Sequence, residues 1–192
     1  MKKIIGLCSA VAIVAIAILV SCNSGSSKPA GNELSKDSLI KRGEYLVTIT
    51  GCDDCHSPKK MGPRGPEIDM ERRLSGYDMK DTFPSVDTNI IKKGWALTNM
   101  QLTGWAGPWG ASFTANITSD ETGIGNWSYA QFKKAITEGK WKGMDGNRPL
   151  MPPMPWQNYK DMSDEDLRSI FAYLKTIPPV KNAVPAYEPP HM

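Results

Sequence analysis

Apolar residues recur at helical spacing in three separate stretches of the chain. Residues 37–49, 127–138 and 163–177 each place them three or four positions apart, which brings them onto one helix face. The last stretch gives the strongest signal, because Ser163 stands where an N-cap is expected and acidic residues fill the first turn. The apolar faces consist of Leu39, Ile40, Gly43, Leu46 and Val47 in the first stretch, Tyr129, Phe132 and Ile136 in the second, and Leu167, Ile170, Phe171 and Leu174 in the third.

The predicted helices also carry residues that start and stop helices. Ser35 or Asp37 can cap the first helix, and Asn126 or Ser128 the second. Gly139 ends the second helix, and two consecutive prolines end the third.

The stretch between the first two helices, residues 57–126, shows little periodicity and is rich in glycine and proline. We expect a long, mostly irregular excursion with short helical pieces. Such an excursion is unusual inside a compact domain, and it is easier to understand if it wraps a large apolar object. The tail is proline-rich and predicts an extended strap. The expected fold class is therefore mainly α with a long irregular insertion.

The N-terminus has the layout of a secretory signal peptide, with Lys2 and Lys3 before an apolar run at 4–20. The run ends in Leu-Val-Ser-Cys at 19–22, which resembles a bacterial lipobox. We expect lipidation of Cys22, which becomes the new N-terminus. The alternative is an uncleaved single-span anchor, which needs about 20 apolar residues. Both place the remainder outside the cytoplasm, at the periplasmic side of a bacterial membrane.

These features divide the chain into four parts. The net charge of +3 includes both lysines of the signal, so the mature chain is close to neutral. Charge therefore gives no argument for nucleic-acid binding. The expected parts are a signal peptide at 1–21, a lipidated flexible linker at 22–36, one domain at 37–180 and a proline-rich tail at 181–192.

The cysteines carry the clearest chemical signal. The chain has four cysteines. Cys8 lies in the signal, and the cysteine of the lipobox is expected to carry lipid, so only Cys52 and Cys55 remain for chemistry within the domain. Together with His56 they form Cys-x-x-Cys-His, the spacing of c-type haem attachment. Two thiols add to the two vinyl groups of one haem, and the histidine is held beneath the iron. We therefore expect one covalent haem c.

Other uses of this cysteine pair fit the sequence less well. A zinc site needs about four ligands, and His191 is the only further histidine. A thioredoxin-like redox pair needs a βαβ context, which the pattern does not predict.

The sixth iron ligand is expected to be a methionine, and Met/His ligation raises the reduction potential. Met154 is favoured because Pro153 and Pro155 stiffen the chain on both sides. Met151 is the rival, and a histidine would have to be His191. The mature chain offers Met61, Met70, Met79, Met100, Met144, Met151, Met154, Met162 and Met192.

Several other residues are candidate neighbours of the haem. Arg148 suits a propionate carboxylate, or it is a solvated loop charge. Trp109 and Trp156 pack against the porphyrin or fill the core. Pro63 or Pro66 would offer a carbonyl to the outer nitrogen of the axial histidine, and the sequence does not choose between them.

Short motifs spread over most of residues 40–180 repeat the pattern of a known family. They are Gly43-Glu-Tyr-Leu-Val47, Gly51-Cys-Asp-Asp-Cys-His-Ser57, Gly107-Pro-Trp-Gly110, Ala115-Asn-Ile-Thr118, Glu121-Thr-Gly-Ile-Gly-Asn-Trp127, Phe132, Arg148-Pro-Leu-Met-Pro-Pro-Met-Pro-Trp156 and Met162-Ser-Asp-Glu-Asp-Leu167. They resemble class I c-type cytochromes, in particular single domains of the cytochrome c subunits of bacterial alcohol and gluconate dehydrogenases. Those subunits carry several haem motifs and this chain has one, so it resembles a free-standing, single-haem lipoprotein relative.

The resemblance implies the cytochrome c fold, in which an N-terminal helix crosses a C-terminal helix and a methionine loop closes the haem pocket. In that family the axial methionine stands in a Met-Pro-aromatic step, which is Met154-Pro155-Trp156 here.

The expected function is transfer of single electrons between respiratory or dehydrogenase protein partners, with no small-molecule substrate and no enzymatic activity. One alternative is a haem-relay subunit within a larger dehydrogenase or oxidase complex. Another is a haem enzyme or gas sensor with an open iron site. A peroxidase needs a distal acid–base residue, and only the histidine near the C-terminus is left for that role.

Overall fold

The computed structural model describes residues 34–190. The predicted signal, the lipidation site at Cys22, His191 and Met192 lie outside these residues. Along the chain the structure has α2 (Lys36–Ile49), α3 (Cys52–His56), β1 (Lys59–Gly62), β2 (Gly65–Ile68), η1 (Met70–Arg72), α4 (Thr88–Lys92), β3 (Leu97–Thr98), β4 (Gly104–Gly107), β5 (Gly110–Phe113), α5 (Tyr129–Glu138), η2 (Trp141–Gly143), η3 (Trp156–Tyr159) and α6 (Asp164–Leu174).

The three predicted helices are confirmed as α2, α5 and α6. Ser35 caps α2 by accepting a hydrogen bond from the backbone N–H of Ser38. Ser128 and Gln131 form a reciprocal capping box at the start of α5. Ser163 caps α6, which ends at Leu174, three residues earlier than predicted.

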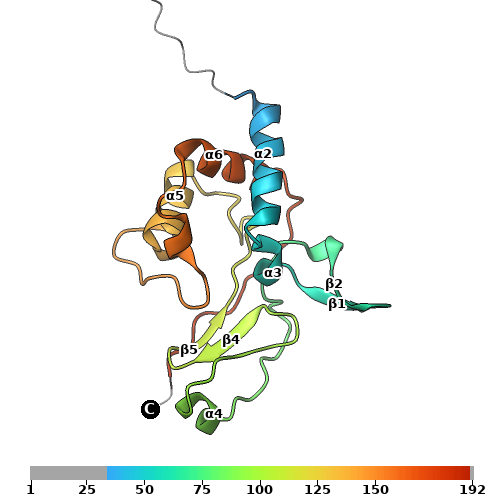
Figure 1. Ribbon diagram of the computed structural model, residues 1–192, viewed down its shortest axis with the longest axis vertical. Helices are drawn as coiled ribbons and strands as arrows, with labels where there is room; N and C mark the ends of the chain where they lie inside the picture. Colours follow the sequence, from blue (N-terminus) through green and yellow to red (C-terminus); the bar gives the residue numbers. More distant parts are fainter. Residues whose placement is uncertain (1–33, 191–192) are drawn as a thin grey trace, which may run out of the picture. The chain divides into compact units, whose positions relative to one another are not determined.

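The N- and C-terminal helices α2 and α6 cross at close range, as the resemblance implied (Figure 1). Gly43 permits this approach, because a Cβ atom there would lie 1.9 Å from the carbonyl oxygen of Ser169. The core forms around the crossing, with Leu46 and Val47 from α2 packed against Leu167, Ile170, Tyr173 and Leu174 of α6, and with Phe132 from α5. The close crossing therefore depends on a residue without a side chain.

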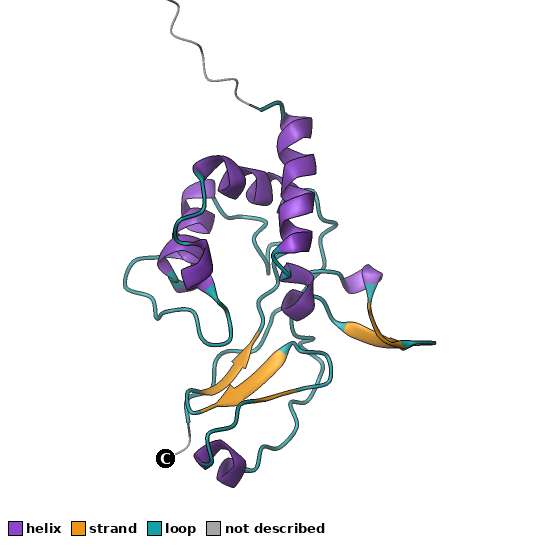
Figure 2. Ribbon diagram, viewed as in Figure 1, coloured by secondary structure: helices purple, strands orange, loops and turns teal. Residues whose placement is uncertain are grey.

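The mainly α expectation needs a correction, because the described part of residues 57–126 contains two small antiparallel sheets (Figure 2). One is the β1–β2 hairpin, and the other has the strand order β3-β4-β5. The strands are two to four residues long and rich in glycine, so they lack the alternation that identifies a strand in a sequence. The fold is thus mixed around a helical core.

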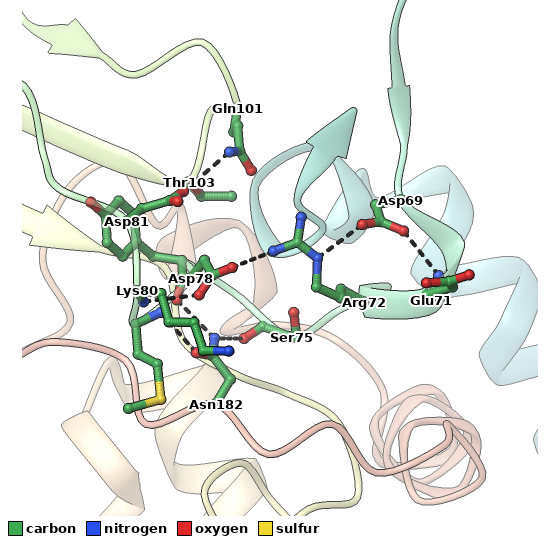
Figure 3. Close-up of polar contacts among 12 residues, drawn as sticks. Asp69, Glu71, Arg72, Ser75, Asp78, Lys80, Asp81, Gln101, Thr103 and Asn182 are labelled. Carbon is green, nitrogen blue, oxygen red and sulfur yellow. Dashed lines mark hydrogen bonds and ion pairs between the residues drawn. The ribbon is translucent and has the colours of Figure 1, made fainter. Parts of the chain in front are cut away.

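The tail runs extended across the domain, in agreement with the predicted strap. The Asn182 side-chain amide donates to the carbonyl oxygens of Ser75 at 2.7 Å and Tyr77 at 2.8 Å, and its oxygen accepts from the backbone N–H of Met79. Glu188 pairs with Ala111 of β5 through two backbone hydrogen bonds. The Asn182 contacts hold residues 75–79 (Figure 3), and the Glu188 pairing holds the tail against β5.

An arginine within the same region ties two turns together. Arg72 pairs with Asp69 at 2.8 Å, and its other arm pairs with Asp78 (Figure 3). Both carboxylates are mostly buried. Because these pairs and the Asn182 contacts act together, residues 69–79 are held in a defined path. Across residues 34–190, none of the helices has the length and apolar character needed to span a bilayer.

Candidate haem-binding site

The Cys-x-x-Cys-His motif forms its own short helix, α3, directly after α2 (Figure 1). Gly51 separates the two helices in a left-handed conformation, with φ of 70°, which a residue with a side chain rarely adopts. Within α3, Cys52, Cys55 and His56 stand at i, i+3 and i+4, so they share one face of the helical turn. Both cysteines are half-buried free thiols. One helix face therefore presents both thiols and the imidazole together.

The ring of His56 is fixed by a hydrogen bond that the sequence did not indicate. Its Nδ1 lies 2.8 Å from the backbone carbonyl oxygen of Ala115, in the loop after β5. This assignment replaces Pro63 and Pro66, which lie on the exposed β1–β2 hairpin. A carbonyl can only accept, so Nδ1 carries the proton and Nε2 keeps its lone pair. Metal-binding histidines commonly donate their other ring N–H to a backbone carbonyl in this way, which fixes the orientation of the ring.

Burial also favours the form of the ring that binds a metal. It lowers the pKa of His56 below its ordinary value, and the hydrogen bond to Ala115 only partly opposes this effect. The imidazole is therefore neutral at neutral pH, as a metal ligand must be.

The backbone of His56 is held by the segment around Gly76 and Tyr77, which also bonds to Thr114. The Gly76 N–H donates to the carbonyl of His56 at 2.7 Å, and Tyr77 N–H donates to the carbonyl of Thr114 at 3.0 Å. Gly76 has φ of 78°, and a Cβ atom there would lie 2.4 Å from the Thr114 carbonyl oxygen. The segment that holds the backbone of His56 is thus joined directly to the segment that holds its ring.

The sequence also did not indicate an ion pair between α3 and Arg73. Asp53, between the two cysteines, accepts from Arg73 Nε at 2.9 Å and Nη2 at 2.7 Å. The Ser57 hydroxyl donates to the same carboxylate at 2.7 Å. Burial would raise the pKa of Asp53, but the hydrogen bonds from Arg73 and Ser57 outweigh it and lower that pKa. The side chains are only 14% and 18% exposed, so the aspartate is a buried, paired anion within the motif.

The loop with the candidate sixth ligand is anchored at two places. The Ser112 hydroxyl donates to the carbonyl of Pro152 at 2.6 Å, which ties the loop to β5. Beyond the loop, the Tyr159 hydroxyl lies 3.4 Å from the carbonyl oxygen of Thr50. Burial raises the pKa of Tyr159, and nearby Cys52 and Cys55 add to the effect. The end of the methionine loop therefore lies beside the cysteine pair.

The positions of the methionines narrow the choice of ligand. Five are at least half exposed, and Met162 packs against the helical core. Within the described part of the chain this leaves Met151 and Met154, both half-buried and both in the anchored loop. The choice of Met154 stays a prediction. The exposed five are Met61, Met70, Met79, Met100 and Met144.

Arg148 is half-buried in the structure. Its guanidinium lies over two aromatic rings, 4.9 Å from the centroid of Trp141 and 5.3 Å from that of Tyr187. Burial lowers its pKa, and no acidic side chain of residues 34–190 lies within ion-pair distance of it. A half-buried cation without a carboxylate partner fits a propionate, although pairing with a propionate stays a prediction.

The two tryptophans pack against glycines of the chain. A Cβ atom on Gly107 would lie 2.4 Å from the ring of Trp109, and one on Gly139 would lie 2.4 Å from the ring of Trp156. Each ring therefore fills space within the fold.

The residues present fit a covalent haem. The histidine keeps one nitrogen free, and both thiols are free on the same helix face. Arg148 has no carboxylate partner among residues 34–190. In addition, the Thr114 hydroxyl, next to the residue that holds the His56 ring, is buried without a hydrogen-bond partner. An unsatisfied buried polar atom beside a site suggests a missing group there.

Comparison with known proteins agrees with this chemistry. No family model matches the chain. It is 31% identical over 154 residues to the gluconate 2-dehydrogenase cytochrome c subunit of Pantoea cypripedii, which covers 79% of this chain and 26% of that subunit. The fructose dehydrogenase cytochrome subunit of Gluconobacter japonicus is 28% identical over 88% of this chain and 27% of its own length. The cytochrome c subunit of the quinone-dependent alcohol dehydrogenase of Komagataeibacter europaeus is 37% identical, over 71% of this chain and 21% of its own length.

The chain spans about a quarter of the length of these curated relatives. It is therefore homologous to a single domain of cytochrome c subunits of bacterial dehydrogenases. The predicted resemblance is confirmed at this level.

Proposed function

We propose that this protein is a single-haem c-type cytochrome that carries electrons one at a time between protein partners. The observation that carries the proposal is the support of His56, whose Nδ1 is held by Ala115 while Cys52 and Cys55 share its helix face. Homology to domains of dehydrogenase cytochrome c subunits supports the same function.

Each site residue has a distinct role in holding the haem. Cys52 and Cys55 would bond it covalently, His56 would bind the iron through Nε2, and Met154 would supply the second iron ligand from the chain. Arg148 would neutralise a propionate between its two aromatic neighbours. A haem bound here supplies a one-electron iron couple. With His56 and Met154 both holding the iron, no site would be left on it for a substrate, so the protein would carry electrons rather than act as an enzyme.

The anchor completes the proposal. Cleavage before Cys22 and lipidation would place the domain at the periplasmic side of a membrane, on the linker at 22–36. Fully extended, residues 23–35 of that linker would reach roughly 40 Å from the anchor. The domain could then move between a donor and an acceptor in the same membrane.

A second candidate function is a haem-relay subunit that stays within one larger complex. The relatives favour it, since they are named as subunits of gluconate, fructose and alcohol dehydrogenases. Affinity purification from native membranes distinguishes the two, because a relay subunit co-purifies with a stoichiometric dehydrogenase or oxidase and a shuttle does not.

The test of the proposed function uses the protein produced with a c-type maturation system. Its mass is expected to increase by one haem, and its reduced spectrum is expected to be unchanged by carbon monoxide. Rapid binding of carbon monoxide by the reduced protein would instead support an enzyme or gas sensor with an open iron site. No haem on the purified chain would overturn the proposal.

A further inference from the structure

The pair formed by Asp53 and Arg73 connects the haem motif to the C-terminal helix. Beyond its two contacts with Asp53, Arg73 donates from Nη1 to the hydroxyl of Tyr173 at 2.6 Å. Tyr173 is a buried core residue of α6, and the guanidinium carbon lies 5.8 Å from its ring centroid. The Ser57 hydroxyl, which donates to Asp53, also accepts from the Leu74 N–H at 2.9 Å. An unbroken set of contacts thus runs from the motif to α6.

The position of the pair gives it an electrostatic effect on anything bound to α3. Asp53 stands between the two cysteines and three residues before His56, so its carboxylate is a fixed negative charge on the attachment helix. Arg73 places a fixed positive charge against it. Because both side chains are largely shielded from solvent, salt and water screen these charges less than surface charges.

A charge near a haem shifts the reduction potential of the iron, and the sign of the charge sets the direction of the shift. A negative charge favours the oxidised iron, which carries one more positive charge, and a positive charge favours the reduced iron. An aspartate within the attachment motif alone would therefore favour the ferric state. The opposing arginine is expected to cancel most of this effect.

We propose that Asp53 and Arg73 are positioning residues that together set the reduction potential of the haem and hold α3 against α6. The inference rests on the proposed haem site and deepens it. Removal of one charge leaves the other uncompensated beside the site. Removal of both restores neutrality.

A neighbouring arginine provides a matched control. Arg72 forms the same kind of half-buried pairs, with Asp69 and Asp78 (Figure 3). Among the described residues, these carboxylates are its ion-pair partners, and neither belongs to α3. Loss of its charge therefore tests whether a weakened 69–79 segment is enough to change the potential. If the pair on Asp53 acts only through fold stability, Arg72→Gln and Arg73→Gln should behave alike.

The experiment is a potentiometric titration of the haem-loaded full chain and four variants. At a fixed ambient potential, Asp53→Asn should raise the ratio of reduced to oxidised protein by roughly three- to tenfold, and Arg73→Gln should lower it by a similar factor. The double variant should return close to the wild-type ratio, and Arg72→Gln should not change it. Shifts of the two single variants in the same direction, or no shift in either, would overturn the inference.

A fifth variant keeps the test decisive if a single charge loss prevents folding. Arg73→Lys retains the cation without the two-point contact, so it should keep the wild-type ratio while it lowers the unfolding temperature. A shifted ratio in Arg73→Lys would contradict the electrostatic part of the inference. Absence of haem from the wild-type chain would instead be a failure of the proposed function, which the mass measurement detects separately.

Discussion

His56 and Ala115 are joined by a hydrogen bond of 2.8 Å although they lie 59 positions apart in the chain. The bond runs from an imidazole nitrogen to a backbone oxygen, so no side chain at position 115 is needed to make it. What keeps the carbonyl in place is the adjoining segment, in which Gly76 and Tyr77 bridge His56 and Thr114. The support of the histidine is therefore a property of the backbone path.

This relationship predicts that Gly76→Ala damages the site. The new methyl group would lie 2.4 Å from the Thr114 carbonyl oxygen and push the 114–115 segment away from His56. We expect a loss of about 3 kcal/mol of unfolding free energy in chemical denaturation. We also expect a changed ferric spectrum, since the ligand loses its orientation.

Gly146→Ala is the matched control. Gly146 has nearly the same φ, 81° against 78°, but nothing lies within 4 Å of its Cβ position. Gly146→Ala should therefore lose only about 1–2 kcal/mol of unfolding free energy, which is the cost of a left-handed backbone for a residue with a side chain. Its ferric spectrum should be unchanged. Equal effects of the two substitutions would show that the clash at Thr114 has no consequence for the site.

The methionine loop gives a second prediction. Met154→Ala should abolish the ferric iron–sulfur charge-transfer band and make the reduced protein bind carbon monoxide, because it opens one axial position. Met151→Ala, three residues away in the same anchored loop, should leave both properties as in the wild type. The reverse result, with the band lost only in Met151→Ala, would assign the ligand to Met151. Absorption spectra of both oxidation states are sufficient for the comparison.

Arg148 carries a third prediction. Arg148→Gln removes a half-buried cation that has no carboxylate partner in the described chain, so the ratio of reduced to oxidised haem should fall severalfold at a fixed potential. Arg148→Lys should recover part of this loss, since it keeps the charge without the planar donor geometry. Lys142→Gln is the control, because Lys142 lies 4.7 Å from the same Trp141 ring but is solvent-exposed. An equal effect of both substitutions would argue against a propionate contact at Arg148.

The sequence predicted those parts of the molecule that leave a periodic or spaced signal. The faces of α2, α5 and α6 repeat at helical spacing, and Cys52, Cys55 and His56 have a fixed spacing. The strands escaped prediction because β3 has only two residues and the short β4 and β5 contain glycine. They are held by pairing with one another and, at β5, with the tail.

The support of the site could not be predicted for a different reason. A backbone carbonyl has no residue identity, so nothing at Ala115 marks it as the partner of His56. The Asp53–Arg73 pair joins positions twenty residues apart across irregular chain, where no period relates them. Such contacts are set by the tertiary path of the segments around residues 74–77 and 114–117 rather than by local pattern.

The fourth prediction concerns acid stability and the contact between α5 and α6. The carboxylate of Asp164 accepts from Lys133 at 2.7 Å, from the Tyr129 hydroxyl at 2.7 Å and from Arg168 at 2.6 Å. The hydrogen bond from Lys133, followed by those from Tyr129 and Arg168, lowers the pKa of Asp164 far below its ordinary value. A carboxylate with a lowered pKa in the folded state stabilises the fold above its unfolded pKa, which is about 4, and this contribution is lost as the pH falls toward the folded value.

Asp164→Asn should therefore destabilise the protein at pH 7 and have a smaller effect at pH 3, measured as the difference in unfolding temperature from the wild type. The carboxylate is surface-exposed, so the effect at pH 7 should shrink in high salt. Asp161→Asn, which removes a carboxylate 3.9 Å from Lys160 in the preceding turn, is the control for loss of one surface charge. If the difference between the wild type and Asp164→Asn is the same at both pH values, the three donors do not stabilise the ionised carboxylate. The junction of α5 and α6 would then depend on apolar packing such as that of Phe132 against Phe171, whose ring centroids lie 5.3 Å apart.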